Sequence, residues 1–273
     1  MSDRPERDTA FYDATFAASP DELNSAIRRA AFGEDIGQFS WTTAEEHRRF
    51  QHQLGIGPTA RCWRWLRGQA GQRSSWCAQR AVDLSVLIIH AAGIATANDA
   101  ATRQGLGDRA SFLVHDAREP LPFETGSFDA IISIDSINHI FARATMFAEW
   151  SRVLRSGGRI LYTDAVVVTG PITRDEMLAR RPSMGEFVFT PFGADEPLLR
   201  AADFVDVCIE DATENIAAVA AAWQSARSMA SRQLDALEGP EANATFQHFL
   251  HIVHLLAAER RLSRLAYTAR QPL

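Results

Sequence analysis

Two polar side chains that could carry chemistry each lie at or just past the end of a predicted strand. His139 comes shortly after the apolar run Ala130–Ile134, and Asp164 ends the run that begins at Ile160. An imidazole titrates near neutral pH, so a histidine at the mouth of a pocket can remove a proton from a substrate. If the two predicted strands are neighbours in one sheet, Asp164 lies close enough to His139 to orient the imidazole or to share its role as a base. The pair therefore predicts a general base; the alternative is that His139 bonds a backbone carbonyl and Asp164 caps a turn.

The segments around these residues alternate between strand and helix. Ala130–Ile134 is rich in isoleucine, which is typical of a strand covered on both faces. Phe141–Leu154 has helical periodicity, and Gly157-Gly158 is expected to end that helix. Ile160–Thr163 predicts the next strand. A strand–helix–strand unit implies a parallel sheet in an α/β fold.

The rest of the chain predicts helices before this unit and a mixture after it. An N-terminal helical lid is expected over residues 1–53, a core over 54–273, and a cap insertion at about 170–200. Further elements are expected in this order: a strand at Arg109–Val114, helices after Thr173 and over Asp195–Ala202, a strand of antiparallel type at Phe204–Asp211, helices at Asn215–Leu237 and Phe246–Arg260, and a strand at Leu262–Ala269.

Composition limits the function classes. The 273 residues carry a mild net charge of −6 and no Lys/Arg-rich run, so nucleic-acid binding is not expected. No apolar run is long enough to span a bilayer, and a cytoplasmic location is the expectation. The three cysteines are widely spaced, which argues against a disulfide framework and a zinc site. No metal is expected, although His248, His251 and His254 recur at intervals of three on one predicted helix.

The middle of the chain resembles the class I S-adenosylmethionine (SAM)-dependent methyltransferases. The resemblance is carried by Asp116-Ala117, Leu121–Phe123, Gly126–Ser133 and Val153–Leu161, in this order and spacing, and is close over residues 91–168. It implies a Rossmann-like α/β fold with a mostly parallel sheet, one antiparallel strand and a helical cap. It also implies SAM as cofactor and a small-molecule acceptor of the natural-product, quinone, sterol or glycine-derivative class, in a monomer or homodimer. Another doubly wound domain is the alternative.

The same resemblance implies roles for particular residues. Asp116 would accept from the adenine amino group, with the Ala117 backbone beside it, and Ser133 and Asp135 would face the methionine part of the cofactor. His139 and Asp164 resemble the His/Asp arrangement of members that methylate sugar hydroxyls. Gln38 and Trp41 are expected lid contacts; the alternative for Trp41 is packing against the sheet edge.

One stretch departs from the family. Within residues 62–90, the part from Cys62 to Arg80 shows neither strand nor amphipathic-helix periodicity, and only Gly68 and Gly71 remain where the family has a glycine-rich turn. Ile88-Ile89-His90 stands where an acid should accept from the ribose hydroxyls. We interpret the stretch as a reading-frame shift, with a genuine loss of the motif as the alternative. In either case, a catalytically impaired or inert protein with the methyltransferase fold is the alternative function. An NAD-dependent enzyme is a further alternative, but it would need an intact Gly-x-Gly-x-x-Gly, which is missing.

Overall fold

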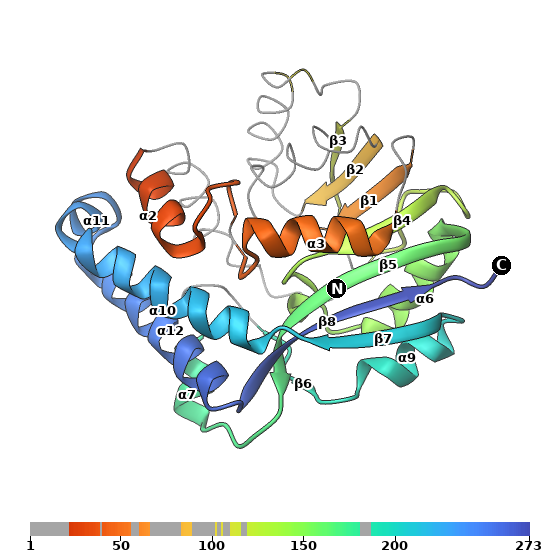
Figure 1. Ribbon diagram of the computed structural model, residues 1–273. Helices are drawn as coiled ribbons and strands as arrows, with labels where there is room; N and C mark the ends of the chain where they lie inside the picture. The colour runs from red at the N-terminus through yellow and green to blue at the C-terminus, as the bar shows by residue number, and fades with distance from the viewer. Residues whose placement is uncertain are drawn as a thin grey trace, which may run out of the picture.

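A mixed β-sheet runs through the centre of the molecule (Figure 1). The computed structural model describes residues 22–38, 40–55, 60–65, 83–88, 102, 105, 110–115, 119–180 and 187–273. The strand order is β3-β2-β1-β4-β5-β8-β7, and β6 pairs with β5. The strands are β1 (Arg61–Trp65), β2 (Asp83–Ile88), β3 (Ala110–Val114), β4 (Phe128–Ser133), β5 (Leu154–Val168), β6 (Thr190–Pro191), β7 (Val205–Asp211) and β8 (Leu262–Arg270).

The predicted mostly parallel sheet with one antiparallel strand is confirmed. β8 runs antiparallel to both of its neighbours, β5 and β7, while the pairs from β3 to β5 are parallel. The strand that runs against the rest is therefore β8. The predicted strand of antiparallel type at Phe204–Asp211 is confirmed as well, because β7 pairs antiparallel with β8 and its burial alternates along the strand.

Helices cover the sheet and gather beyond the carboxyl ends of β4 and β5. In Figure 1, α2, α10, α11 and α12 form a helical layer at that end, α3 crosses in front of the sheet, and α6 and α9 lie on its other side. The helices are α2 (Glu22–Phe32), α3 (Ala44–Leu54), α6 (Arg143–Val153), α7 (Arg174–Ala179), α9 (Asp195–Ala201), α10 (Thr213–Met229), α11 (Ser231–Glu238) and α12 (Pro240–Ala258), with the 3-10 helix η1 (Ile137–His139) after β4.

The N-terminal segment and the C-terminal helices share one apolar cluster. Ile27 and Phe32 of α2 are buried with Trp223 of α10 and Phe249 of α12. Phe32 and Trp223 meet edge to face, with ring centroids 5.3 Å apart. The helical layer over the strand ends is thus built from both ends of the chain. By contrast, α9, which lies in the expected cap insertion at 170–200, packs its Leu199 into the core beneath the sheet.

Two element boundaries differ from those expected. The helix α6 ends at Val153 because Leu154 already has extended backbone angles, so Gly157-Gly158 does not end it. The glycine pair instead lies in an irregularity at the start of β5, where Phe128 pairs with Leu154 but Ala130 pairs with Arg159. A Cβ on Gly158 would meet the Arg155 carbonyl oxygen at 2.8 Å, so only glycine fits this bend.

The predicted helix at Asn215–Leu237 is interrupted at Ala230, which separates α10 from α11. No glycine or proline marks the break. The side chain of Arg227 donates to Glu238 and to Asn243, which ties the end of α10 to the far side of the break. The fully buried Leu234 anchors α11 in the apolar cluster. Long-range contacts therefore set this boundary.

The stretch that lacks strand periodicity does form a strand at its start. β1 lies between β2 and β4, and its Trp63 is fully buried, with the ring centroid 5.9 Å from that of Trp150 on α6. The missing strand periodicity of residues 62–80 therefore did not reveal β1, whereas β2 ends at Ile88, where the family resemblance places the end of the second strand. Residues 66–82, which include Gly68 and Gly71, lie outside the described part of the chain.

Candidate functional site

The chain leaves β4 through a strained residue whose carboxylate joins three parts of the molecule. Asp135 has a φ of 48°, in the left-handed region that side chains other than glycine seldom adopt. Its Oδ1 accepts from the Thr163 hydroxyl at 2.7 Å and from Arg264 Nε at 2.9 Å. Its Oδ2 accepts from the backbone N–H of Trp41 at 3.0 Å. The segment before α3, the sheet and β8 therefore meet at this carboxylate.

Arg264 extends this arrangement into a buried network. The guanidinium is fully buried and donates to both carboxylate oxygens of Glu46 at 2.8 Å and to Thr42 at 2.8 Å. Burial lowers the pKa of Arg264, but the charges of Asp135 and Glu46 outweigh burial and raise the pKa above its usual value. We call Asp135, Thr163, Arg264 and Glu46 the Asp135 cluster.

The two expected lid contacts have their side chains turned into the protein. The indole of Trp41 packs against Trp223 and Phe249, with ring centroids 5.9 and 6.0 Å away. Gln38 is fully buried, where it donates to the Glu34 carbonyl at 2.6 Å and accepts from the Ile36 N–H at 2.8 Å. Their role at the cofactor stays a prediction, and these contacts assign both side chains to the helical layer.

Asp164 belongs to a second buried network beneath the helical layer. Its Oδ2 accepts from Arg143 Nη2 at 2.7 Å and from the Thr190 hydroxyl at 3.0 Å. Arg143 also donates to Asp195 at 2.6 Å, and the Tyr162 hydroxyl donates to the same oxygen at 3.1 Å. We call these five residues the Asp164 cluster. The Oδ1 of Asp164 accepts from the Val166 N–H at 2.9 Å, so both carboxylate oxygens are already bonded within the protein and the geometry favours a positioning role for Asp164.

His139 lies at the edge of the same region. It is the last residue of η1, its side chain is half-buried, and its ring centroid is 4.7 Å from that of Phe187. The Asn138 carbonyl accepts from the Val188 N–H at 2.7 Å, which fixes the segment bearing Phe187 beside η1. The imidazole is therefore held on an aromatic face just past the end of β4, where the sequence predicted it.

Two buried polar atoms near the carboxyl end of β4 have no hydrogen-bond partner in the described chain. Within the described chain, Ser133 Oγ and Asn138 Oδ1 are buried and have no hydrogen-bond partner. Ser133 is the last residue of β4 and Asn138 lies in η1. Buried polar groups are nearly always paired, so these two atoms are candidate contacts for a ligand at the carboxyl end of the sheet. The sequence analysis indicated Ser133 through its strand-end position but assigned no role to Asn138.

Four predicted cofactor contacts cannot be placed. Gly68, Gly71, Asp116 and Ala117 lie outside the described residues. β3, which precedes Asp116, is described and spans Ala110–Val114, in agreement with the predicted strand.

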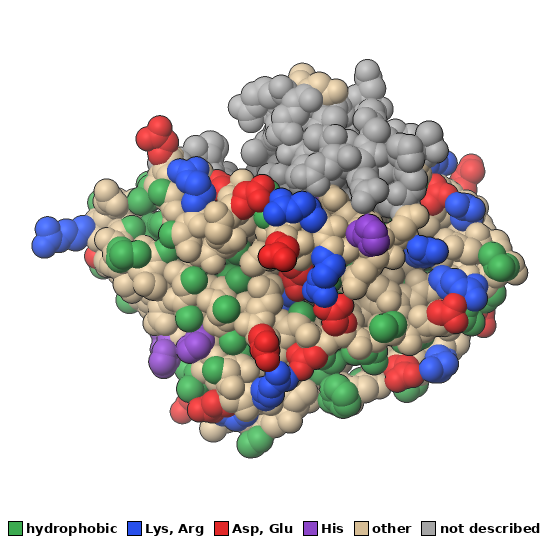
Figure 2. Space-filling view, viewed as in Figure 1, with side chains coloured by type: hydrophobic (Ala, Val, Ile, Leu, Met, Phe, Trp, Pro, Cys, Tyr) green, Lys and Arg blue, Asp and Glu red, His purple; other side chains and the backbone are tan. Residues whose placement is uncertain are grey.

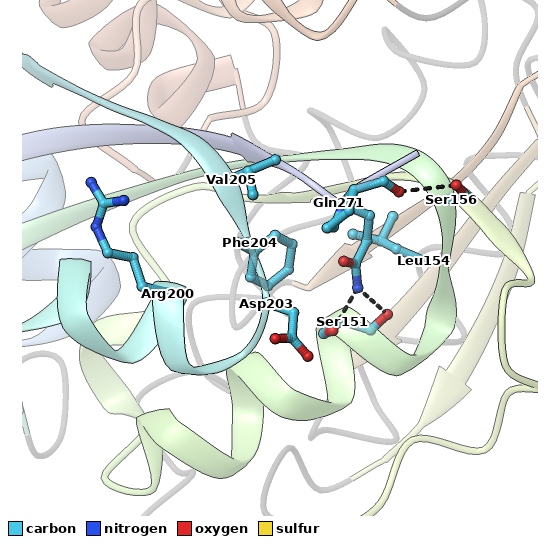
Figure 3. Close-up of a pocket in the computed structure, with 9 residues that line it drawn as sticks. Ser151, Leu154, Ser156, Arg200, Asp203, Phe204, Val205 and Gln271 are labelled. Atoms are coloured by element: carbon cyan, nitrogen blue, oxygen red, sulfur yellow. Dashed lines mark hydrogen bonds between the residues drawn. The ribbon is translucent and has the colours of Figure 1, made fainter.

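The cavity in Figure 3 lies at the opposite end of the sheet. It has a volume of about 700 Å³ and is lined by residues at the amino ends of β5 and β7, among them Leu154 and Val205. Gln271 points toward Ser151 there and donates to its carbonyl and hydroxyl oxygens. In open α/β sheets ligands bind beyond the carboxyl ends of the strands, so this cavity is not the expected cofactor site.

An ion pair joins the helix α7 to the residue that precedes β8. Glu176 accepts from Arg261 at 2.7 and 2.9 Å and closes a capping box with Thr173.

The hydrogen bonds from Arg261 lower the pKa of Glu176 from 4.5 to about 2. A lowered folded-state pKa stabilises the fold above the unfolded value and loses that contribution as the pH falls. We expect unfolding free energy to fall more steeply between pH 4.5 and about 2 in the natural chain than in Glu176→Gln. Equal slopes in urea titrations across that window would contradict this.

The comparisons with known proteins place this arrangement in a family. The family described as "Methyltransferase domain" matches residues 68–162, which contain β2 to β4, α6 and the first part of β5. The 27-O-demethylrifamycin SV methyltransferase of Amycolatopsis mediterranei (strain S699) is 30% identical over 179 residues, which are 64% of each chain. Residues 68–162 match a methyltransferase domain of the class I SAM-dependent type. The resemblance found in the sequence is thereby confirmed.

Other relatives match this methyltransferase domain over shorter stretches. The chloroplastic tocopherol O-methyltransferase of Arabidopsis thaliana is 45% identical over 65 residues, which are 24% of this chain and 18% of the relative. This chain thus spans less than two thirds of the length of these curated relatives.

Solved structures confirm the Rossmann-like fold of the methyltransferase domain. Phosphoethanolamine N-methyltransferase 2 of Haemonchus contortus, in complex with S-adenosyl-L-methionine, has a TM-score of 0.79 at 17% identity and covers 96% of this chain and 60% of its own. The cyclopropane synthase MmaA2 of Mycobacterium tuberculosis has a TM-score of 0.79 at 14% sequence identity. The match covers 98% of this chain and 100% of the synthase chain. The [4+2]-cyclase SpnF has a TM-score of 0.73, so the fold alone does not specify the reaction.

Neither a metal cluster nor a membrane helix is found in the described ranges. There, no three His, Cys, Asp or Glu side chains are grouped so that they could hold a metal ion. His254 of the predicted histidine row is paired through Nδ1 with the Ala217 carbonyl oxygen at 3.0 Å. No described helix is both long and apolar enough to cross a membrane. On the face seen in Figure 2, acidic and basic side chains are interspersed.

Proposed function

We propose that this chain transfers the methyl group of SAM to a small-molecule acceptor at the carboxyl ends of β1, β4 and β5. The observation that carries the proposal is the pair of unpartnered buried atoms, Ser133 Oγ and Asn138 Oδ1, beside His139. A ligand with polar groups in this place would satisfy both atoms. The family match over residues 68–162 supports SAM as that ligand.

The residues present fit the methionine part of this cofactor. Ser133 Oγ can donate to a carboxylate or accept from an ammonium, and Asn138 Oδ1 can accept from an ammonium. Asp116 and Ala117 would hold the adenine, and Gly68 and Gly71 would border the turn. Asp135 would act through the backbone it holds in place, because its carboxylate is already bonded to Arg264, Thr163 and the Trp41 N–H. When bound, SAM supplies a methyl group activated by its sulfonium.

The chain's own residues would position the acceptor and accept its proton. His139 would remove the proton of an acceptor hydroxyl, and Phe187 would hold the imidazole and form part of the acceptor wall. The Asp164 cluster would keep the floor of the site rigid, because each of its charges is paired. Positioning then contributes most of the rate enhancement, since the donor is already reactive.

We infer a hydroxyl-bearing or amine-bearing natural product, quinone, sterol or glycine derivative as the acceptor. Relatives named for a rifamycin precursor, tocopherol and sarcosine/dimethylglycine support that range. We further propose a cytoplasmic enzyme that works as a monomer or homodimer.

An acceptor panel tests the function. The full chain is incubated with SAM and one compound of each class, and S-adenosylhomocysteine is measured by mass spectrometry. We expect formation that depends on at least one acceptor. No formation with any acceptor, in a folded chain that binds SAM, would contradict methyl transfer and favour the inert descendant.

The anomalous stretch is tested by the gene. If residues 62–90 arose from a shifted reading frame, a neighbouring frame of the nucleotide sequence encodes a glycine-rich turn. A repaired chain would then bind SAM more tightly in isothermal titration. A gene in which neither neighbouring frame encodes such a turn would show that the motif was lost by substitution.

A further inference from the structure

A buried arginine beside the proposed acceptor site has two guanidinium nitrogens without a hydrogen-bond partner in the described chain. Arg180 follows α7 and is only 1% exposed. Its guanidinium lies over the ring of Phe187, 4.9 Å from the centroid, and 5.7 Å from that of Phe249. Within the described chain, Nε and Nη2 have no hydrogen-bond partner. The aromatic contacts hold the group in place but do not satisfy these two donors.

The two unpartnered donors share one edge of the guanidinium. Nε–H and Nη2–H point the same way and form the fork that binds both oxygens of a carboxylate or phosphate. A buried charge without a hydrogen-bonding partner destabilises the folded chain, and structural arginines of this protein are paired: Arg143 and Arg264 each contact two carboxylates. Arg180 therefore differs from the buried arginines that hold the fold together.

The position of this fork links it to the proposed chemistry. Phe187 contacts Arg180 on α7 and also contacts His139, with a ring separation of 4.7 Å. The two candidate functional groups therefore border the same aromatic ring. Burial lowers the pKa of Arg180 to about 10, so the guanidinium remains charged at neutral pH. Asp164 and Asp135 attract it from a distance, and an incoming anion would be the direct partner.

We propose that the Nε/Nη2 fork of Arg180 binds an anionic group, a carboxylate or a phosphate, on the methyl acceptor. This inference rests on the proposed function in taking the anion to belong to the acceptor. It narrows the acceptor class to molecules that carry such a group at a fixed distance from the atom that is methylated. It also gives Arg180 a specificity role distinct from the proton-accepting role of His139.

Thermal unfolding of the full chain tests the fork directly. Inorganic phosphate and acetate are the probes, compared with chloride at equal ionic strength. We expect at least one probe to raise the unfolding temperature of the natural chain, and the better probe identifies the anion. We expect Arg180→Met to lose that rise, Arg180→Lys to keep only part of it because lysine lacks the fork, and Arg174→Met, on the exposed face of α7, to keep all of it.

Stability without added anion provides the second readout. Because Arg180 is buried and incompletely paired, Arg180→Met should unfold at a temperature no lower than the natural chain. A marked loss of stability in Arg180→Met would show a structural arginine and overturn the proposal. A natural chain that neither anion stabilises, or an equal rise in Arg180→Met, would overturn it as well. S-adenosylhomocysteine binding by the same variants is measured separately, so failure of cofactor binding and failure of the anion site are distinguishable.

Discussion

Replacing His139 with alanine should lower kcat for a hydroxyl acceptor by about 10²–10⁴-fold, the usual contribution of a general base. The imidazole is held against Phe187 just past the end of β4, and an alanine there has no group that can accept the acceptor's proton. The measurement is the initial rate of S-adenosylhomocysteine formation at saturating SAM. SAM affinity should change little, because the role assigned to His139 concerns the acceptor.

An amine acceptor provides the internal comparison for this variant. A neutral amine needs no proton removed before it attacks, so His139→Ala should affect its methylation far less. His248→Ala, an exposed histidine on α12, is the matched control and should keep the natural rate with either acceptor. An unchanged rate with a hydroxyl acceptor in His139→Ala would remove the proposed base.

Replacing Arg264 with methionine should destabilise the fold by about 3–5 kcal/mol, as removal of one partner from a buried ion pair does. The substitution leaves the Asp135 carboxylate without its buried counter-charge, and it leaves Glu46 with only the partly exposed Arg49, 3.6 Å away. It also removes the hydrogen bond to Thr42, so the segment before α3 keeps the Trp41–Asp135 hydrogen bond but loses its bond to β8. Chemical denaturation followed by circular dichroism measures the change in unfolding free energy.

An exposed arginine on the turn before β8 is the control for this effect. Arg260 pairs with Asp211 and Glu214 at the surface, and both contacts are open to solvent. Surface pairs contribute little, so Arg260→Met should leave the denaturation midpoint nearly unchanged. If the two variants lose similar amounts of unfolding free energy, burial of the Asp135 cluster does not increase the contribution of its ion pairs to stability.

Local patterns in the sequence predicted much of the fold. The isoleucine-rich run around Ile131 indicated β4, because a doubly covered strand needs apolar side chains on both faces. A threonine with a glutamate three residues later is a local signal for a helix start, and at α3 the Thr43 hydroxyl accepts from the Glu46 N–H. Thr173 and Glu176 likewise marked the start of α7. These signals act within one turn of helix or one strand, so sequence spacing suffices to find them.

Long-range pairing could not be predicted in the same way. Arg264 and Glu46 are 218 residues apart, and nothing near either residue indicates that they meet. Arg143 resembled an ordinary polar residue at a helix start, although it joins Asp164 to Asp195. Arg180 was missed for the same reason: its burial between two aromatic rings depends on helices α7 and α12 coming together. The sequence located the strand end of the site, and tertiary contacts supplied its charged surroundings.

A crystal structure of the chain grown with S-adenosylhomocysteine tests the central claim most directly. The account predicts that the ligand lies at the carboxyl ends of β1 and β4, with a polar group within hydrogen-bond distance of Ser133 Oγ or Asn138 Oδ1. Ligand in the cavity lined by Leu154 and Val205 instead, or no ligand at saturating concentration in an intact fold, would contradict it.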